Sequence, residues 1–383
     1  MTVDAARHIS ARVEQKRPLR RGWTTGACAT AAAKAAYTAL LGGEFPDPVE
    51  VMLPRSERVA FALAETTRNG NSATAGVVKD AGDDPDVTHG ALVRATVSLA
   101  IPGTGVMFRA GPGVGIITRP GLPLPPGEPA INPVPREMIR RAIAEVSAFY
   151  GGAGDVLVEL SIPEGEALAQ STLNPRLGII GGLSILGTTG IVVPFSCAAW
   201  INSILRGIDV ARAMGITHVA GSTGRTSEAA IQALHGLPDV ALIDMGDFVG
   251  GMLKYLRVHP VPRVSIAGGV AKMTKLGQGR LDLHSKRGEA DLTALAALAR
   301  TLGASDELAS HMARANTVAE AFTIAAGLRL GDTIAAAAWE VAANVLRPAG
   351  VELEIAVFDR TGVLVGRAPF MPVHAGPPGR KRR

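Results

Sequence analysis

The stretch HVAGSTGRTSE at residues 218–228 decides the fold of the second half of the chain. A short apolar run leads into a glycine turn and then a helical pattern, and further β-type runs follow at residues 240–243 and 264–266. Strands that alternate with helices in this way are typical of an α/β domain with a parallel sheet. The sequence therefore predicts a Rossmann-like α/β domain, which we place at residues 166–366.

The glycine turn also has features of a binding site for an adenosine cofactor. Glycines let backbone amides approach a ligand, and the start of a helix favours negative groups. An acidic residue follows about twenty positions later, where nucleotide folds place the acid that binds ribose. The predicted cofactor-binding residues are Gly221, Thr223, Gly224, Asp244 and Asp247. The spacing suits NAD as well as S-adenosylmethionine, and an ordinary turn capped by Ser227 is the structural alternative.

The first half of the chain has a different pattern. Thr24 and Thr25 precede an alanine-rich run, which predicts a helix with a hydroxyl cap at its start. A second helix is expected from Asn132 to the residue before Gly151. Strands are expected at residues 49–53, 59–64, 91–99, 115–118 and 156–162. Mixed strands with few crossover helices indicate an α+β domain, at residues 18–165 after a flexible leader at residues 1–17.

Beyond the parallel strands, alanine-rich patterns predict further helices. They are expected at residues 292–302, 308–313, 318–326 and 333–346, with a late strand at 351–358. A disordered basic tail is expected at residues 367–383.

Composition narrows the class of protein. Of 383 residues, 47% are hydrophobic and 19% charged, which is typical of a globular chain large enough for two domains. The net charge is +5, but Arg380, Lys381, Arg382 and Arg383 supply four of these charges at the end of the tail. No basic cluster remains on the body of the protein, so we expect no nucleic-acid partner.

Several features indicate a cytoplasmic protein without a membrane partner. The segment from Leu177 to Leu205 carries no charge, but five glycines and Pro194 interrupt it, which favours buried strands joined by tight turns over a membrane span. Cys28 and Cys197 are the only cysteines, so neither a disulfide framework nor a thiolate metal site is indicated. The N-terminus lacks the apolar core of a signal peptide.

The segment VKDAGDDPDVTHG at residues 78–90 concentrates four carboxylates and a histidine. Their spacing does not match a calcium loop, which requires acids at alternate positions and a closing glutamate. A capped turn between strands is the structural interpretation, and proton transfer is the functional one. The candidate catalytic residues are Asp80, Asp83 and His89, and we predict no protein-bound metal.

A polyanionic substrate would require cations on the wall of its pocket. Candidates beside the glycine- and proline-rich segments are Arg119, Arg136, Arg176, Arg225, Lys272, Lys275, His284 and Lys286. Thr188 and Thr189 lie in a stretch of small residues at 182–190, which suits either a flat ligand or close backbone packing. For any single cation, a solvated surface charge is the alternative.

Several stretches, in one order, resemble the cobalt-precorrin-5B (C-1)-methyltransferase family, often called CbiD. They are LRRGWTTGACATAA at 19–32, residues 79–88, GPGVG at 111–115, INPVPR at 131–136, NPRLGI at 174–179 running on to 190–192, GDFVG at 246–250 and HSK at 284–286. The resemblance covers roughly residues 18–366. The turn at 221–228 and the region 272–275 fit the family only loosely.

The resemblance implies transfer of a methyl group from S-adenosyl-L-methionine to C-1 of cobalt-precorrin-5B, giving cobalt-precorrin-6A in anaerobic cobalamin biosynthesis. Cobalt then arrives with the tetrapyrrole substrate, and the fold differs from that of the common tetrapyrrole methylases. The alternative functions are an NAD-dependent oxidoreductase and a non-enzymatic tetrapyrrole carrier. The sequence is compatible with a homodimer and does not decide the oligomeric state.

Overall fold

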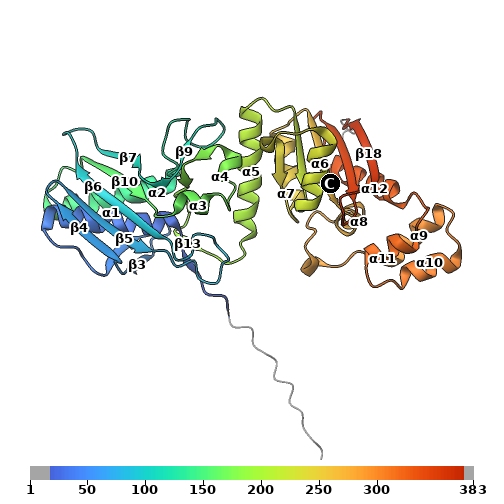
Figure 1. Ribbon diagram of the computed structural model, residues 1–383, viewed down its shortest axis with the longest axis horizontal. Coiled ribbons are helices and arrows are strands. Elements are labelled where there is room, and N and C mark those ends of the chain that lie inside the picture. The colour runs from blue at the N-terminus through green and yellow to red at the C-terminus, as the bar shows by residue number, and fades with distance from the viewer. Residues whose placement is uncertain (1–17, 375–383) are drawn as a thin grey trace, which may run out of the picture.

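The computed structural model describes residues 18–374, apart from the side chain of Lys286. The leader at 1–17 and the basic residues 380–383 lie outside this range. Two large hydrophobic cores organise the described chain, one built from residues between 27 and 185 and the other from residues between 204 and 373. Figure 1 shows the two corresponding parts with helix α5 (Cys197–Ala213) standing between them. The chain is a mixed α/β protein of two domains.

The first domain contains a five-stranded mixed sheet in the order β4-β5-β6-β10-β7. The bounds are Glu65–Asn69 for β4, Ser72–Val78 for β5, Leu92–Leu99 for β6, Val156–Ser161 for β10 and Val106–Ala110 for β7. Burial alternates along β6 and β10, so one face of the sheet lies in the core. Helices α1 (Thr25–Gly42) and α2 (Pro133–Tyr150) pack together, and α1 lies against β5 and β6.

Helix α1 begins where the sequence predicted. The Thr24 hydroxyl accepts a hydrogen bond from the amide of Ala27 at 3.2 Å, which confirms the cap. Alanines on every side of the helix are fully buried, because α1 lies between the sheet and α2.

Short elements surround this sheet. The strands are Gly22–Trp23 (β1), Val49–Met52 (β2), Arg58–Phe61 (β3), Gly113–Val114 (β8), Ile116–Ile117 (β9), Ile179–Ile180 (β11), Gly182–Leu183 (β12) and Ile191–Val192 (β13). They pair as β1 with β13, β2 with β3, β9 with β11 and β8 with β12. The helices are Gly165–Ala169 (α3) and Asn174–Leu177 (α4).

The second domain contains a sheet in the order β15-β14-β16-β17-β18. The bounds are Leu242–Asp244 for β15, His218–Ser222 for β14, Arg263–Gly269 for β16, Glu352–Phe358 for β17 and Leu364–Pro372 for β18. The first four strands run parallel, and β18 is antiparallel to β17. Successive residues of β14 enter different cores, Val219 the large one and Ala220 a smaller one, so both faces of the sheet are covered.

Nine further elements complete this domain. They are Arg225–His235 (α6), the 3-10 turns Asp239–Ala241 (η1) and Ser285–Arg287 (η2), Val249–Val258 (α7), Val270–Gly277 (α8), Leu292–Thr301 (α9), Asp306–Ala313 (α10), Val318–Ile324 (α11) and Leu330–Leu346 (α12). The alanine-rich patterns therefore predicted the last four helices correctly to within a few residues.

Two expectations need correction. The first core includes Ala169 and Ile185, so it extends past residue 165, where we expected the domains to divide. Strand β18 crosses residue 366, because the segment expected to begin a disordered tail pairs with β17. The strand order of the second sheet is 2-1-3-4-5 along the chain, which is one of the two common doubly wound orders and differs from the 3-2-1-4-5-6 order of the dinucleotide-binding Rossmann sheet.

The uncharged segment at 177–205 also differs from its prediction. Only three two-residue strands occur in it, and α5 begins at Cys197, because Ser196 caps the helix by accepting a hydrogen bond from Ala199 at 3.4 Å. Within residues 18–374, no helix is both long and apolar enough to cross a membrane.

Candidate functional site

The carboxyl ends of the parallel strands form the candidate cofactor edge. Strand β14 ends at Ser222, and the amide of Thr223 donates to the carbonyl of Ala267 in β16 at 3.0 Å. The chain passes from β14 to β15 on one side and then from β15 to β16 on the other side of β14, so the direction of the connections reverses here. A crevice at such a switch point is where open α/β sheets bind their ligands.

Two buried polar atoms at this edge lack hydrogen-bond partners. They are the hydroxyl oxygen of Ser222 and Oδ1 of Asp247, and among the described residues the only other such atom belongs to Arg347. Oδ1 of Asp247 lies 3.1 Å from Nζ of Lys272, an ion pair without hydrogen-bond geometry. Lys272 instead donates to the carbonyl of Thr223 at 2.8 Å. Buried polar groups normally form hydrogen bonds. These two atoms could therefore form hydrogen bonds to a polar ligand at this edge.

The two glycines predicted to bind the cofactor differ in their surroundings. Gly221 lies within β14, where a Cβ would be 2.3 Å from the sulfur of Met252, so this glycine serves packing. Gly224 precedes α6, and a Cβ there would meet no atom within 4 Å. A ligand therefore has room to approach the backbone at Gly224 but not at Gly221.

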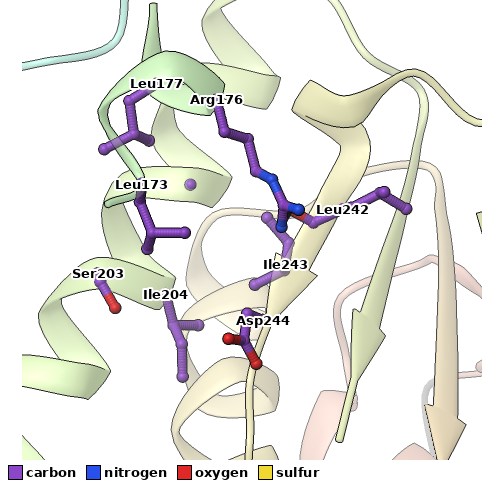
Figure 2. Close-up of a pocket in the computed structure, with 9 residues that line it drawn as sticks. Leu173, Arg176, Leu177, Ser203, Ile204, Leu242, Ile243 and Asp244 are labelled. Atoms are coloured by element: carbon purple, nitrogen blue, oxygen red, sulfur yellow. Dashed lines mark hydrogen bonds between the residues drawn. The ribbon is translucent and has the colours of Figure 1, made fainter. Parts of the chain in front are cut away.

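Asp244 ends β15 and lines a small pocket between the domains. Burial raises the pKa of its carboxyl, and the neighbouring carboxylate of Glu228 raises it further. Figure 2 shows Arg176 reaching down from α4 towards Leu242, with Asp244 at the other end of the pocket. About 20 Å³ is open to a water molecule there, room for roughly one water, so the pocket as it stands does not hold an adenosyl group.

The acidic segment at 78–90 forms a turn beside the first strand pair. Arg20 holds Asp80 with two hydrogen bonds, one from Nη1 to Oδ2 and one from Nη2 to Oδ1 at 3.0 Å. The hydrogen bond from Arg20, followed by one from the amide of Gly82, lowers the pKa of Asp80 to about 2. Asp80 is therefore ionised at neutral pH and a weak proton acceptor.

The other two catalytic candidates lie on the surface of the same turn. Nδ1 of His89 accepts a hydrogen bond from the amide of Ala81 at 3.1 Å, so in the neutral ring the proton sits on Nε2. Oδ2 of Asp83 accepts from the amide of Arg20 at 2.6 Å, and within residues 18–374 this carboxylate forms no ion pair. Asp83 thus offers a carboxylate without an ion-pair partner among the described residues, and His89 presents a donor.

A fourth acid in the turn has a structural role. Asp86 accepts a hydrogen bond from Nζ of Lys79 at 2.7 Å, and Lys79 is only 1% exposed. Asp86 also accepts from the amide and the hydroxyl of Thr88. The turn is therefore built around a buried ion pair.

Known proteins resemble this chain over almost its whole length. The CbiD family model matches residues 12–194, and the model of the CbiD C-terminal domain matches residues 282–369. The chain belongs to the CbiD family. A cobalt-precorrin-5B C(1)-methyltransferase from Bradyrhizobium sp. is 64% identical over 92% of this chain and 94% of its own length. A cobalt-precorrin-5B C(1)-methyltransferase from Halorhodospira halophila is 65% identical over 91% of this chain and 94% of its own length.

A solved structure in the CbiD family is a further relative. It is a cobalamin biosynthesis protein (CbiD) from Archaeoglobus fulgidus, which is 29% identical to this chain. The match covers 66% of this chain and 77% of the length of the other chain. The TM-score is 0.38.

Several of the cations predicted to bind substrate are engaged by protein groups in this CbiD chain. Arg136 is 11% exposed and binds Glu128 as well as two backbone carbonyls. Arg176 binds Glu228 and the carbonyl of Leu242, and Lys275 is buried with Nζ 3.2 Å from the carbonyl of Leu283. Arg136 and Arg176 thus use most of their donors within the protein, and burial limits the access of a substrate to Lys275.

The remaining predicted substrate residues are more accessible. Arg119 donates from Nη1 to the carbonyl of Arg176 at 2.7 Å. Thr188 is exposed, whereas the hydroxyl of Thr189 bonds the backbone of Ile191. The amide of His284 donates to Asp282 at 3.1 Å.

One histidine cluster was not predicted. Nitrogen and oxygen atoms of His218, His235 and Glu354 lie within 4.8 Å of one another, a spacing that a metal could bridge. Glu354 already accepts hydrogen bonds from His235, Ser265 and Arg367. Because His218 begins β14, the cluster lies at the end of the sheet opposite the candidate cofactor edge, and hydrogen bonding explains it.

Proposed function

We propose that this chain is a cobalt-precorrin-5B C(1)-methyltransferase of cobalamin biosynthesis. It transfers a methyl group from S-adenosyl-L-methionine to C-1 of the cobalt tetrapyrrole, giving cobalt-precorrin-6A and S-adenosylhomocysteine. The observation that carries the proposal is the 64% identity over 92% of the chain to an enzyme of that name. The enzyme acts in the cytoplasm, on a substrate that brings its own cobalt.

The methyl donor binds at the carboxyl edge of β14, β15 and β16, in the Rossmann-like part of the second domain. Asp244 accepts hydrogen bonds from the ribose hydroxyls, and the free amides after Gly224 bind the methionine carboxylate. Thr223, Asp247 and the unsatisfied hydroxyl of Ser222 supply further polar contacts. The two polar atoms without hydrogen-bond partners and the open space at Gly224 support this placement.

The residues of the chain act by positioning the reactants. The sulfonium donor supplies an already activated methyl group, so correct placement can lower the barrier by up to about 7 to 11 kcal/mol. Asp83 accepts any proton that the macrocycle releases, because, unlike Asp80, its carboxylate forms no ion pair with a described residue. His89 donates from Nε2 to a substrate carboxylate. Arg119, Thr188 and His284 remain the candidates for other peripheral contacts.

The domains divide between the two cores. We place the first domain at residues 18 to about 195 and the second from α5 to the end of β18. The substrate lies where the two meet, as ligands often do at domain interfaces.

Calorimetric titration with S-adenosylhomocysteine, alongside NAD, tests the cofactor. Incubation with cobalt-precorrin-5B and S-adenosylmethionine then tests the reaction, with mass spectrometry and carbon NMR to detect one added methyl group at C-1. Binding of S-adenosylhomocysteine together with C-1 methylation would bear the proposal out. Binding of NAD alone would indicate an oxidoreductase, and tetrapyrrole binding without methylation would indicate a carrier.

A further inference from the structure

Two large aromatic side chains are exposed at the start of α5. Phe195 is 66% exposed and Trp200 is 45% exposed. Phe195 directly precedes Ser196, the cap of α5, and Trp200 lies in the first turns of the helix, so both belong to the segment that joins the two domains. Apolar side chains of this size normally bury most of their surface. An exposed pair of aromatic residues in one segment is therefore a candidate binding surface.

Local helix packing does not account for this pair. The residue before a helix cap often packs against the fourth helical residue, and Phe195 and Trp200 occupy these positions. No ring contact joins them among the aromatic pairs of the described residues. Phe195 also has a φ of 56°, a left-handed conformation that costs on the order of 1 kcal/mol for a residue with a side chain.

Both aromatic residues are fixed to the predicted site. The amide of Phe195 donates to Oδ1 of Asp84 in the acidic turn at 2.8 Å. Nε1 of Trp200 donates to the carbonyl of Asp244 at 3.2 Å. The Trp200 ring also lies close to Gly246, where a Cβ would be 3.2 Å from it. The pair therefore spans from the proton-transfer candidates to the candidate cofactor edge.

A cation lies beside the same segment. Gly22 of β1 pairs with Val192 of β13, so Arg21 lies next to the residues that lead into Phe195. Arg21 is exposed, and within residues 18–374 it forms no ion pair. An apolar face with an adjacent guanidinium matches a flat conjugated ring that carries carboxylates on its rim.

We propose that Phe195 and Trp200 form an aromatic platform on which the macrocycle of the cobalt tetrapyrrole lies, with Arg21 at its rim. This proposal rests on the proposed function and assigns the surface that holds the substrate. The two residues position the macrocycle between the acidic turn and the methyl donor, and they take no part in proton or methyl transfer.

Titration with cobalt uroporphyrin, a stable cobalt tetrapyrrole with peripheral carboxylates, tests the platform. Fluorescence quenching and absorbance give the dissociation constant for the full chain and its variants. We expect F195A and W200A each to weaken binding about tenfold or more, as aromatic anchors of binding sites do. W200F should bind nearly as tightly as the parent, because it keeps an aromatic face. The matched control is F149A, which removes an 81% exposed aromatic residue from the end of α2 and should change nothing.

F195A keeps the backbone hydrogen bond to Asp84, and its affinity for S-adenosylhomocysteine should equal that of the parent. Unchanged tetrapyrrole binding in both alanine variants, or no binding by the parent chain, would overturn the platform. Loss of a dimer in sedimentation velocity, with tetrapyrrole binding intact, would instead show that a second copy covers the pair. The proposed function fails separately, if the parent chain does not methylate cobalt-precorrin-5B.

Discussion

The guanidinium of Arg176 holds the carboxylate of Glu228 with two hydrogen bonds, from Nη1 to Oε2 at 3.0 Å and from Nη2 to Oε1 at 2.7 Å. Arg176 lies in α4, beside the core of the first domain, and Glu228 lies in the first turn of α6 in the second. These hydrogen bonds, which Arg176 donates to Glu228, raise the pKa of Arg176. This ion pair joins the two domains beside the pocket that Arg176 and Asp244 line.

Removal of this ion pair should destabilise the protein. Arg176 and Glu228 are 26% and 19% exposed, so R176A leaves a partly buried carboxylate without its partner. We expect the free energy of unfolding to fall by about 2 kcal/mol in urea denaturation followed by circular dichroism. R109A, which breaks the more exposed pair with Glu159, is the control and should cost less than about 1 kcal/mol. Equal losses in the two variants would contradict a special role for Arg176.

Asp244 should control the affinity for the methyl donor. Because hydrogen bonds to a charged group contribute about 1.5 to 3 kcal/mol, D244N should weaken binding of S-adenosylhomocysteine roughly tenfold to a hundredfold in calorimetry. D306N is the control, since Asp306 is 92% exposed on α10. If D244N binds like D306N, Asp244 does not contact the ribose.

The raised pKa of Asp244 adds a pH dependence to that affinity. The ionised carboxylate is the acceptor, and burial makes it take up a proton at a higher pH than an ordinary aspartate does. Affinity of the parent chain should therefore decrease on acidification earlier than for a typical carboxylate contact. D244N should lack this decrease, and calorimetry at a series of pH values compares the two.

Much of the fold was predictable because local patterns determine it. The threonine cap of α1 and the helical pattern between Asn132 and Gly151 are short-range signals, and the structure confirms both helices. Strand β5 was missed because its buried residues include Ala73 and Ala75, which are too small to give a β-type hydrophobic pattern. Helix α5 was missed because an uncharged segment rich in glycine indicates strands, although Ser196 carried a capping signal.

The candidate site was less predictable because distant residues meet in it. The glycine turn and Asp244 follow from sequence spacing alone. The pairs Arg20 with Asp80 and Trp200 with Asp244 join residues 60 and 44 positions apart, and no local pattern indicates them. A sequence can show that Asp80 is acidic, but only the fold shows that Arg20 neutralises it.

The acidic turn should limit stability in acid. Hydrogen bonds from Lys79 and Thr88 outweigh burial and lower the pKa of Asp86. A carboxyl with a folded-state pKa below its unfolded value of about 3.9 stabilises the fold above that pH. This contribution is lost as the pH falls through the folded-state pKa. The free energy of unfolding should thus decrease below about pH 4, as urea titrations at several pH values would measure.

D86N isolates this contribution. The substitution leaves the ammonium of Lys79 buried without a counter-charge, so at pH 7 it should cost about 3 kcal/mol. The acid-dependent decrease should be smaller than in the parent, because one depressed carboxyl is gone. E50Q, which breaks an exposed ion pair with Arg58, should change neither the free energy of unfolding at pH 7 nor its decrease in acid. A D86N variant as stable as E50Q would mean that Lys79 finds another partner.

Two glutamates in strand β17 differ in burial. Glu354 is fully buried and accepts hydrogen bonds from Ser265, His235 and Arg367, whereas the side chain of Glu352 is 42% exposed beside Arg263. E354Q removes the negative charge that Arg367 faces and should lower the free energy of unfolding by about 3 kcal/mol. E352Q, two residues away in the same strand, should cost less than about 1 kcal/mol. Because the strand and the size of the change are matched, a difference between the variants isolates the buried hydrogen-bond network, and equal unfolding curves would show that this network adds no net stability.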